Sequence, residues 1–125
     1  MFFVFFNPGN RCLNCGWEGI EISFGVKNGI VRDNYIEGSY RQGLSIHNST
    51  EGGTITTNNT VVNCCSPDST RAISATAESA NGVFVGNQIL DCPEGGMNVA
   101  NAPNQIVENN TIETSGGIAM SVRST

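Results

Sequence analysis

His47 is the residue of this chain best suited to proton transfer, because it is the single histidine of the sequence. A histidine positioned beside a second acid or base can protonate or deprotonate a reacting oxygen. Glu21 could supply that second group at a glycosidic bond. The alternative is a solvated histidine beside Ser and Thr on a polar surface. The choice depends on whether the fold brings His47 and Glu21 together.

Four further residues, Tyr40, Arg41, Asp68 and Arg71, could bind a sugar. An arginine guanidinium can hold the carboxylate of a sugar acid through two parallel hydrogen bonds. The Tyr40 ring could stack on a sugar ring. Solubility alone would explain these polar side chains equally well, so both interpretations stay open.

The cysteines could bind a metal or form disulfides. There are five, an odd number, so they cannot all pair within one chain. Cys12 and Cys15 form a C-x-x-C pair, and Cys64 and Cys65 are adjacent, but no second C-x-x-C and no histidine cluster completes a zinc tetrad. We therefore predict no metal site and no cofactor.

An internal repeat decides which elements position these residues. Each copy contains Gly, Asn or Asp, then Asn, then any residue, then an apolar residue. The anchoring residues are Asn10, Asn34, Asn59, Asn87 and Asn110. Their separations are 24, 25, 28 and 23 residues. A Gly-apolar-x-apolar segment follows each anchor, with Ala72 replacing the glycine in one copy.

A third repeated position lies five residues after each anchor and is always Cys or Ser. Its members are Cys15, Ser39, Cys64, Cys92 and Ser115. Cys64 and Cys92 would lie in adjacent copies, at a separation that a disulfide accepts. Parallel in-register side chains often have the wrong torsion for a disulfide, so we expect five free, packed thiols.

Each copy predicts three short strands and a tight bend. Apolar residues precede the anchor, the residue just before it tolerates a left-handed backbone, and a second and third strand follow. One copy cannot bury its apolar face alone, whereas stacked copies bury a continuous column. The sequence therefore predicts an all-β fold, a right-handed parallel β-helix of about five coils, with the anchoring asparagines hydrogen-bonded in an internal ladder.

The third strand of each coil carries the candidate catalytic pair. Alternation turns two columns outward, namely Glu21, Ser45, Ser74, Asn98 and Ala119, and Ser23, His47, Thr76, Ala100 and Ser121. Glu21 and His47 would lie one coil apart and two residues out of register, at roughly 8 Å by diagonal strand geometry. Tyr40, Arg41, Asp68 and Arg71 would lie in the loops just before this strand.

The repeat resembles that of the pectin lyase-like superfamily of parallel β-helices. The likeness is clearest in Val31-Arg32-Asp33-Asn34-Tyr35-Ile36 followed by Gly43-Leu44-Ser45-Ile46, and it extends over roughly residues 5–123. Such proteins include pectate lyases, polygalacturonases, alginate epimerases and periplasmic copper-maturation proteins, and most act on or bind polysaccharides. The resemblance implies an extracellular or periplasmic protein and, if an enzyme, a polysaccharide lyase, glycoside hydrolase or uronate epimerase. None of the catalytic motifs of polygalacturonases occurs here.

Composition excludes several other classes. Six Lys plus Arg against 11 Asp plus Glu give a net charge of −5, which removes the attraction to phosphates that nucleic-acid binding needs. No apolar run reaches the length of a membrane span, and the 125 residues predict one domain over 1–125. Ice binding would require outward ranks of Thr, but Thr56 and Thr57 would stack on Val, Arg and Phe side chains.

Two functions remain. The first is a β-helix that binds or modifies a polysaccharide, and the alternative is a structural or oligomeric module without enzyme activity. A stack of coils exposes unpaired strands at both ends, so we expect self-association through at least one end or a piece of a longer β-helix. Phe2, Phe3, Phe5 and Phe6 would either cover the first coil or meet a partner there.

Overall fold

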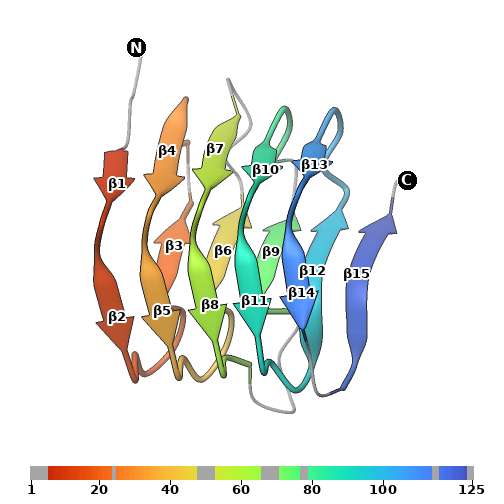
Figure 1. The fold of residues 1–125 in the computed structure, drawn as a ribbon. Helices are drawn as coiled ribbons and strands as arrows, with labels where there is room; N and C mark the ends of the chain where they lie inside the picture. The colour runs from red at the N-terminus through yellow and green to blue at the C-terminus, as the bar shows by residue number, and fades with distance from the viewer. Residues whose placement is uncertain are drawn as a thin grey trace.

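The computed structural model describes residues 6–23, 25–47, 53–65, 71–76, 79–113 and 116–123. These residues form three parallel sheets of five strands (Figure 1). The first sheet contains β1 (Phe6–Pro8), β4 (Gly29–Arg32), β7 (Thr54–Thr57), β10 (Val83–Val85) and β13 (Ile106–Glu108). The second contains β2 (Arg11–Leu13), β5 (Tyr35–Glu37), β8 (Thr60–Val62), β11 (Gln88–Leu90) and β14 (Thr111–Glu113). The third contains β3 (Ile20–Ile22), β6 (Leu44–His47), β9 (Ile73–Thr76), β12 (Gly95–Ala100) and β15 (Ile118–Arg123).

Successive coils stack with one strand in each sheet, so the predicted all-β parallel β-helix is confirmed. Four full turns separate β1 from β13, and β14 and β15 continue into a fifth. The right-handed sense of the coil stays a prediction. Among the described elements, none is a helix able to cross a membrane. The Phe2, Phe3 and Phe5 side chains of the N-terminal segment lie outside the described residues, and nothing is described of the Phe6 side chain.

The bend before each anchoring asparagine has the predicted left-handed backbone. The residues there have φ between 53° and 69°, and they are Gly9, Asp33, Asn58, Gly86 and Asn109. Asn, Asp and Gly adopt this conformation at the lowest cost, which explains why only these three types occupy the position. The chain therefore turns sharply from the first sheet into the second in every coil.

The anchoring asparagines form a continuous internal ladder, as predicted. The Asn34 Nδ2 donates to Asn59 Oδ1 at 2.9 Å, and the Asn59 Nδ2 donates to Asn87 Oδ1 at 3.0 Å. Each acceptor oxygen also receives the backbone N–H of the preceding asparagine. Asn10 and Asn110 extend the ladder at its two ends, with bonds of 3.2 and 2.9 Å. Buried amides are thereby satisfied in the interior of the bend.

Strand register confirms most predicted columns. Thr56 pairs with Val31 and Phe84, and Thr57 pairs with Arg32 and Val85, so no outward rank of Thr forms there. Leu44 pairs with Ile73, and Ile73 with Met97.

The predicted register of the last coil is wrong. Asn98 pairs with Ser121 instead of Ala119, and Ala100 pairs with Arg123 instead of Ser121. The prediction aligned Gly117 with Gly96 because both precede an apolar-x-apolar segment. Gly117 instead has a φ of 73° and lies against the backbone of Glu94 and Gly95, so it forms the bend before β15 and shifts that strand by two residues.

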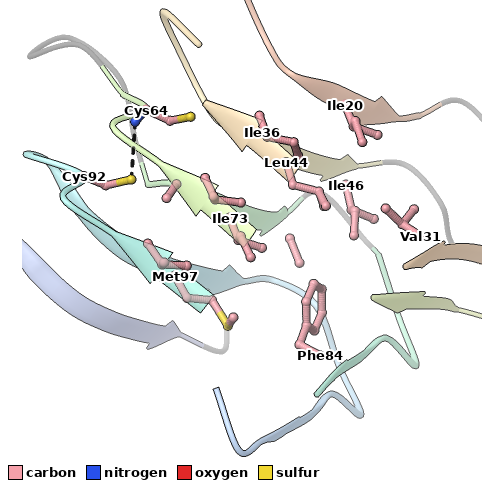
Figure 2. Close-up of a cluster of buried hydrophobic side chains, with 14 of the residues drawn as sticks. Ile20, Val31, Ile36, Leu44, Ile46, Cys64, Ile73, Phe84, Cys92 and Met97 are labelled. Atoms are coloured by element: carbon pink, nitrogen blue, oxygen red, sulfur yellow. Dashed lines mark hydrogen bonds between the residues drawn. The ribbon is translucent and has the colours of Figure 1, made fainter. Parts of the chain in front are cut away.

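The core is a column of inward side chains shared by the three sheets, including Val31, Ile36, Leu44, Ile73 and Phe84 (Figure 2). Its two ends differ. In the first coil Ile20 and Ile22 are only 9% and 1% exposed, whereas Met120 and Val122 in the last coil are 48% and 65% exposed. The inward side chains of the third sheet are therefore buried in the first coil and exposed in the last coil.

Candidate functional site

The structure brings His47 and Glu21 into direct contact. Glu21 lies in the middle of β3 and His47 at the end of β6, and the two strands are parallel neighbours in the third sheet. The distance from His47 Nε2 to Glu21 Oε1 is 2.6 Å. The diagonal estimate of roughly 8 Å describes backbone positions, and the long glutamate side chain closes that gap.

This contact limits the chemistry of the pair. A glycosidase that uses two groups on opposite sides of a glycosidic bond separates them by about 5 Å or more, which leaves room for the sugar. A separation of 2.6 Å leaves no such room. Glu21 is instead placed to orient the His47 ring, so the pair can bind through hydrogen bonds or act as a single base.

An exposed aromatic pair lies on the same two coils. The Trp17 and Tyr40 rings have centroids 5.7 Å apart and an interplanar angle of 18°, so they stack across the coils that contain β3 and β6. The two residues are 56% and 50% exposed. Tyr40 was expected in this loop, but sequence reasoning missed Trp17. Its position, 23 residues before Tyr40, is one repeat earlier and would have revealed it.

Arg41 joins this aromatic pair. Its guanidinium carbon lies 5.0 Å from the centre of the Trp17 ring, a cation–π arrangement. Its Nη1 also lies 3.5 Å from Glu18 Oε1, so the positive charge is compensated by a nearby carboxylate. The structure thus brings the predicted Tyr40 and Arg41 together and adds Trp17 and Glu18.

Arg71 has a structural contact. Its Nη1 donates to the Glu94 carbonyl at 2.8 Å, which links the third coil to the fourth. Asp68 lies outside the described residues, so its predicted place in the sugar-binding loop stays a prediction.

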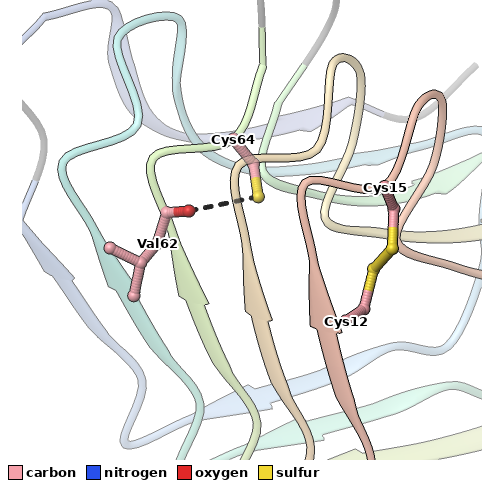
Figure 3. Close-up of a disulfide and its surroundings, with 4 residues drawn as sticks. All are labelled: Cys12, Cys15, Val62 and Cys64. Atoms are coloured by element: carbon pink, nitrogen blue, oxygen red, sulfur yellow. Dashed lines mark hydrogen bonds between the residues drawn. A yellow bond between two sulfur atoms is a disulfide. The ribbon is translucent and has the colours of Figure 1, made fainter.

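The expectation of five free thiols is wrong. Cys12 and Cys15 form a disulfide, with Cα atoms 6.1 Å apart (Figure 3). The physical reason is the left-handed Asn14, with a φ of 53°, because it turns the chain between the two cysteines and brings them face to face. Sequence reasoning compared cysteines between coils and did not consider this bend.

Cys64 and Cys92 are free and buried, as expected. The Cys64 backbone N–H donates to Cys92 Sγ at 3.4 Å (Figure 2), and Cys64 Sγ donates to the Val62 carbonyl at 3.3 Å (Figure 3). A hydrogen bond from the Cys92 thiol lowers the pKa of Cys64 to about 7. The same bond raises the pKa of Cys92 above its usual range.

The described part of the chain contains no group of three or more His, Cys, Asp or Glu side chains that could hold a metal ion. Cys12 and Cys15 have no thiolate to offer because they are bonded to each other. Cys64 and Cys92 provide two sulfur atoms, both inside the stack.

Comparison with known proteins gives a family match. No curated protein and no solved structure matches the chain. The family model described as "Periplasmic copper-binding protein (NosD)" matches residues 18–125. Because this match covers most of the chain and the structure is a parallel β-helix, the chain belongs to the NosD family.

Proposed function

We propose that this β-helix binds a polysaccharide on the segments that lead into β3 and β6, where Trp17 and Tyr40 are exposed. The observation that carries the proposal is the exposed Trp17–Tyr40 stack, which lies in the segments leading into the two strands that carry Glu21 and His47. Stacking rings beside a few polar side chains are typical of sugar-binding surfaces, since the rings contact the apolar faces of a sugar and the polar groups contact its hydroxyls.

Binding without turnover fits this geometry better than catalysis. The 2.6 Å contact between His47 and Glu21 leaves no room for a glycosidic oxygen between them. Elimination or epimerisation of a uronate requires a group that holds the sugar carboxylate, and Arg41 and Arg71 are already engaged with Glu18 and the Glu94 carbonyl.

The family description suggests copper, but the described residues do not fit a copper site. Copper in proteins is usually held by three or more N and S donors. The described residues bring donors together only in pairs, His47 with Glu21 and Cys64 with Cys92, so we derive no step through copper.

An oxidising compartment is part of the proposal. The family is described as periplasmic. The Cys12–Cys15 disulfide supports an extracytoplasmic location, because disulfides persist where thiols are not kept reduced.

A glycan array tests the proposed function, followed by assays for new reducing ends and for unsaturated products on each bound polysaccharide. We expect binding to at least one glycan and no product. Product formation that His47→Ala abolishes would replace binding with catalysis. No binding to any glycan would contradict the proposal and favour the alternative, a structural module without its own enzyme activity.

A further inference from the structure

The charges around the Trp17–Tyr40 stack indicate which sugars it suits. Arg41 is the cation of this cluster, and both of its interactions are within the protein, one with the Trp17 ring and one with Glu18. A sugar carboxylate would have to displace Glu18 from Arg41. Glu21, a further exposed carboxylate, lies four residues after Trp17 in β3.

The net charge of the chain also disfavours the binding of acidic sugars. It carries 11 Asp plus Glu against six Lys plus Arg, so an anionic polymer is repelled at long range. The other arginine predicted to bind a sugar acid, Arg71, donates to the Glu94 carbonyl in the next coil. The described residues therefore offer aromatic surface without an uncommitted cation beside it.

We infer that the Trp17–Tyr40 stack is a binding subsite for neutral saccharides, whose apolar ring faces pack against the exposed aromatic rings. This inference rests on the proposed polysaccharide-binding function and names its ligand class. Trp and Tyr provide large contact surfaces at a small cost in side-chain entropy, since each has only two main torsions. The Cys12–Cys15 disulfide closes the bend two residues before Trp17 and restrains the segment that presents it.

Trp17 is the single tryptophan of the chain, so its fluorescence reports on this site alone. The experiment titrates the protein with neutral hexasaccharides (cellohexaose, xylohexaose, maltohexaose) and with hexagalacturonate, following Trp17 emission and, in parallel, heat by calorimetry. We expect at least one neutral ligand to change the emission and hexagalacturonate to leave it unchanged. Raising the salt concentration should leave the neutral affinity unchanged, because no charge pairing contributes.

Tyr40→Ala keeps the reporter and should weaken neutral binding about tenfold or more, as the loss of a stacking anchor does. Tyr35→Ala is the matched control. Tyr35 also has an arginine over its ring, Arg11 at 5.3 Å, but it lies in the second sheet. The Tyr35→Ala variant should bind neutral saccharides as tightly as the parent protein does. Thermal melts of both variants verify folding.

The outcomes separate the two proposals. Binding of hexagalacturonate at Trp17, or glycan binding detected by calorimetry without any change in Trp17 emission, would overturn the inference and leave the proposed function standing. Equal loss of affinity in the Tyr40 and Tyr35 variants would also overturn it. If calorimetry detects no binding of any glycan, the proposed function itself fails.

Discussion

At the residue scale, Thr56 is a polar side chain in an apolar column. It is fully buried between Val31 and Phe84, and among the described residues its hydroxyl has no hydrogen-bond partner. We expect Thr56→Val to raise the free energy of unfolding by about 1 kcal/mol, because it removes an unpaired buried hydroxyl at nearly constant volume. Urea unfolding measures this, with Thr57→Val on the opposite face of β7 as the control. A loss of stability at Thr56 would show that its hydroxyl is paired.

The Cys64 thiol should make stability depend on pH. Its pKa is lowered from 9.0 to about 7 in the folded protein, so between these values the unfolded state binds more protons than the native state. The free energy of unfolding should therefore rise with pH across this window. The contribution of Cys64 is fully present above the pKa of the unfolded state and is lost as pH falls through the pKa of the folded state. Above the usual cysteine pKa, the raised pKa of Cys92 opposes this trend.

Urea midpoints measured without reductant from pH 6 to 9 test this prediction. Cys64→Ser should flatten the rise, whereas Cys65→Ser, at the adjacent buried free cysteine, should keep it. An identical slope in the parent and the Cys64 variant would contradict a thiolate at Cys64.

At the element scale, the asparagine ladder couples the bends of successive coils. Asn59 accepts from the Asn34 backbone and side chain and donates to Asn87 Oδ1 and the Val31 carbonyl. Asn59→Ala should lower the free energy of unfolding by about 1 to 3 kcal/mol, since buried partners lose their hydrogen bonds. Asn110→Ala, at the partly buried end of the ladder, should cost less. A negligible loss of stability at Asn59, or equal losses at both positions, would contradict a stabilising role for the buried hydrogen bonds of the ladder.

The Cys12–Cys15 disulfide joins β2 to the bend that follows it. Thiol titration of the denatured chain without reductant should therefore detect three thiols, rising to five after reduction, because Cys64, Cys65 and Cys92 are free. Cys15→Ser should yield four without reductant, since Cys12 loses its partner. Five thiols in the unreduced parent would show that Cys12 and Cys15 are not joined by a disulfide.

At the scale of the whole molecule, the exposed apolar residues of the last coil predict self-association through the C-terminal end of the stack. Met120 and Val122 belong to the inward column but are 48% and 65% exposed in the last coil, beside the unpaired edges of β13, β14 and β15. Such an edge pairs readily with another chain. We expect a second copy of the chain to cover this end, or further coils if these residues are a piece of a longer β-helix.

Sedimentation equilibrium over a hundredfold concentration range should show the weight-average mass rising above 13.2 kDa. Val122→Lys should reduce the association because it places a charge on the open apolar end. Ser121→Lys, on the other face of the same strand, should leave it unchanged. A mass of 13.2 kDa at every concentration would contradict association through this end.

The sequence by itself determined the repeating framework. Residues of one type recurring at each coil position predicted the three parallel sheets, the left-handed bends and the ladder from Asn10 to Asn110. This was predictable because stacking places equivalent positions directly over one another, so each column must suit its own neighbours. The same columns placed Glu21 and His47 on one face of adjacent strands.

Only the tertiary structure decided the contacts made by side chains and bends. It closed the Glu21–His47 contact to 2.6 Å, stacked Trp17 on Tyr40, paired Arg41 with Glu18 and joined Cys12 to Cys15. It also shifted β15 by two residues and left one end of the core exposed. A repeat specifies which positions stack, whereas rotamers, local turns and the ends of the stack depend on neighbours that differ from coil to coil.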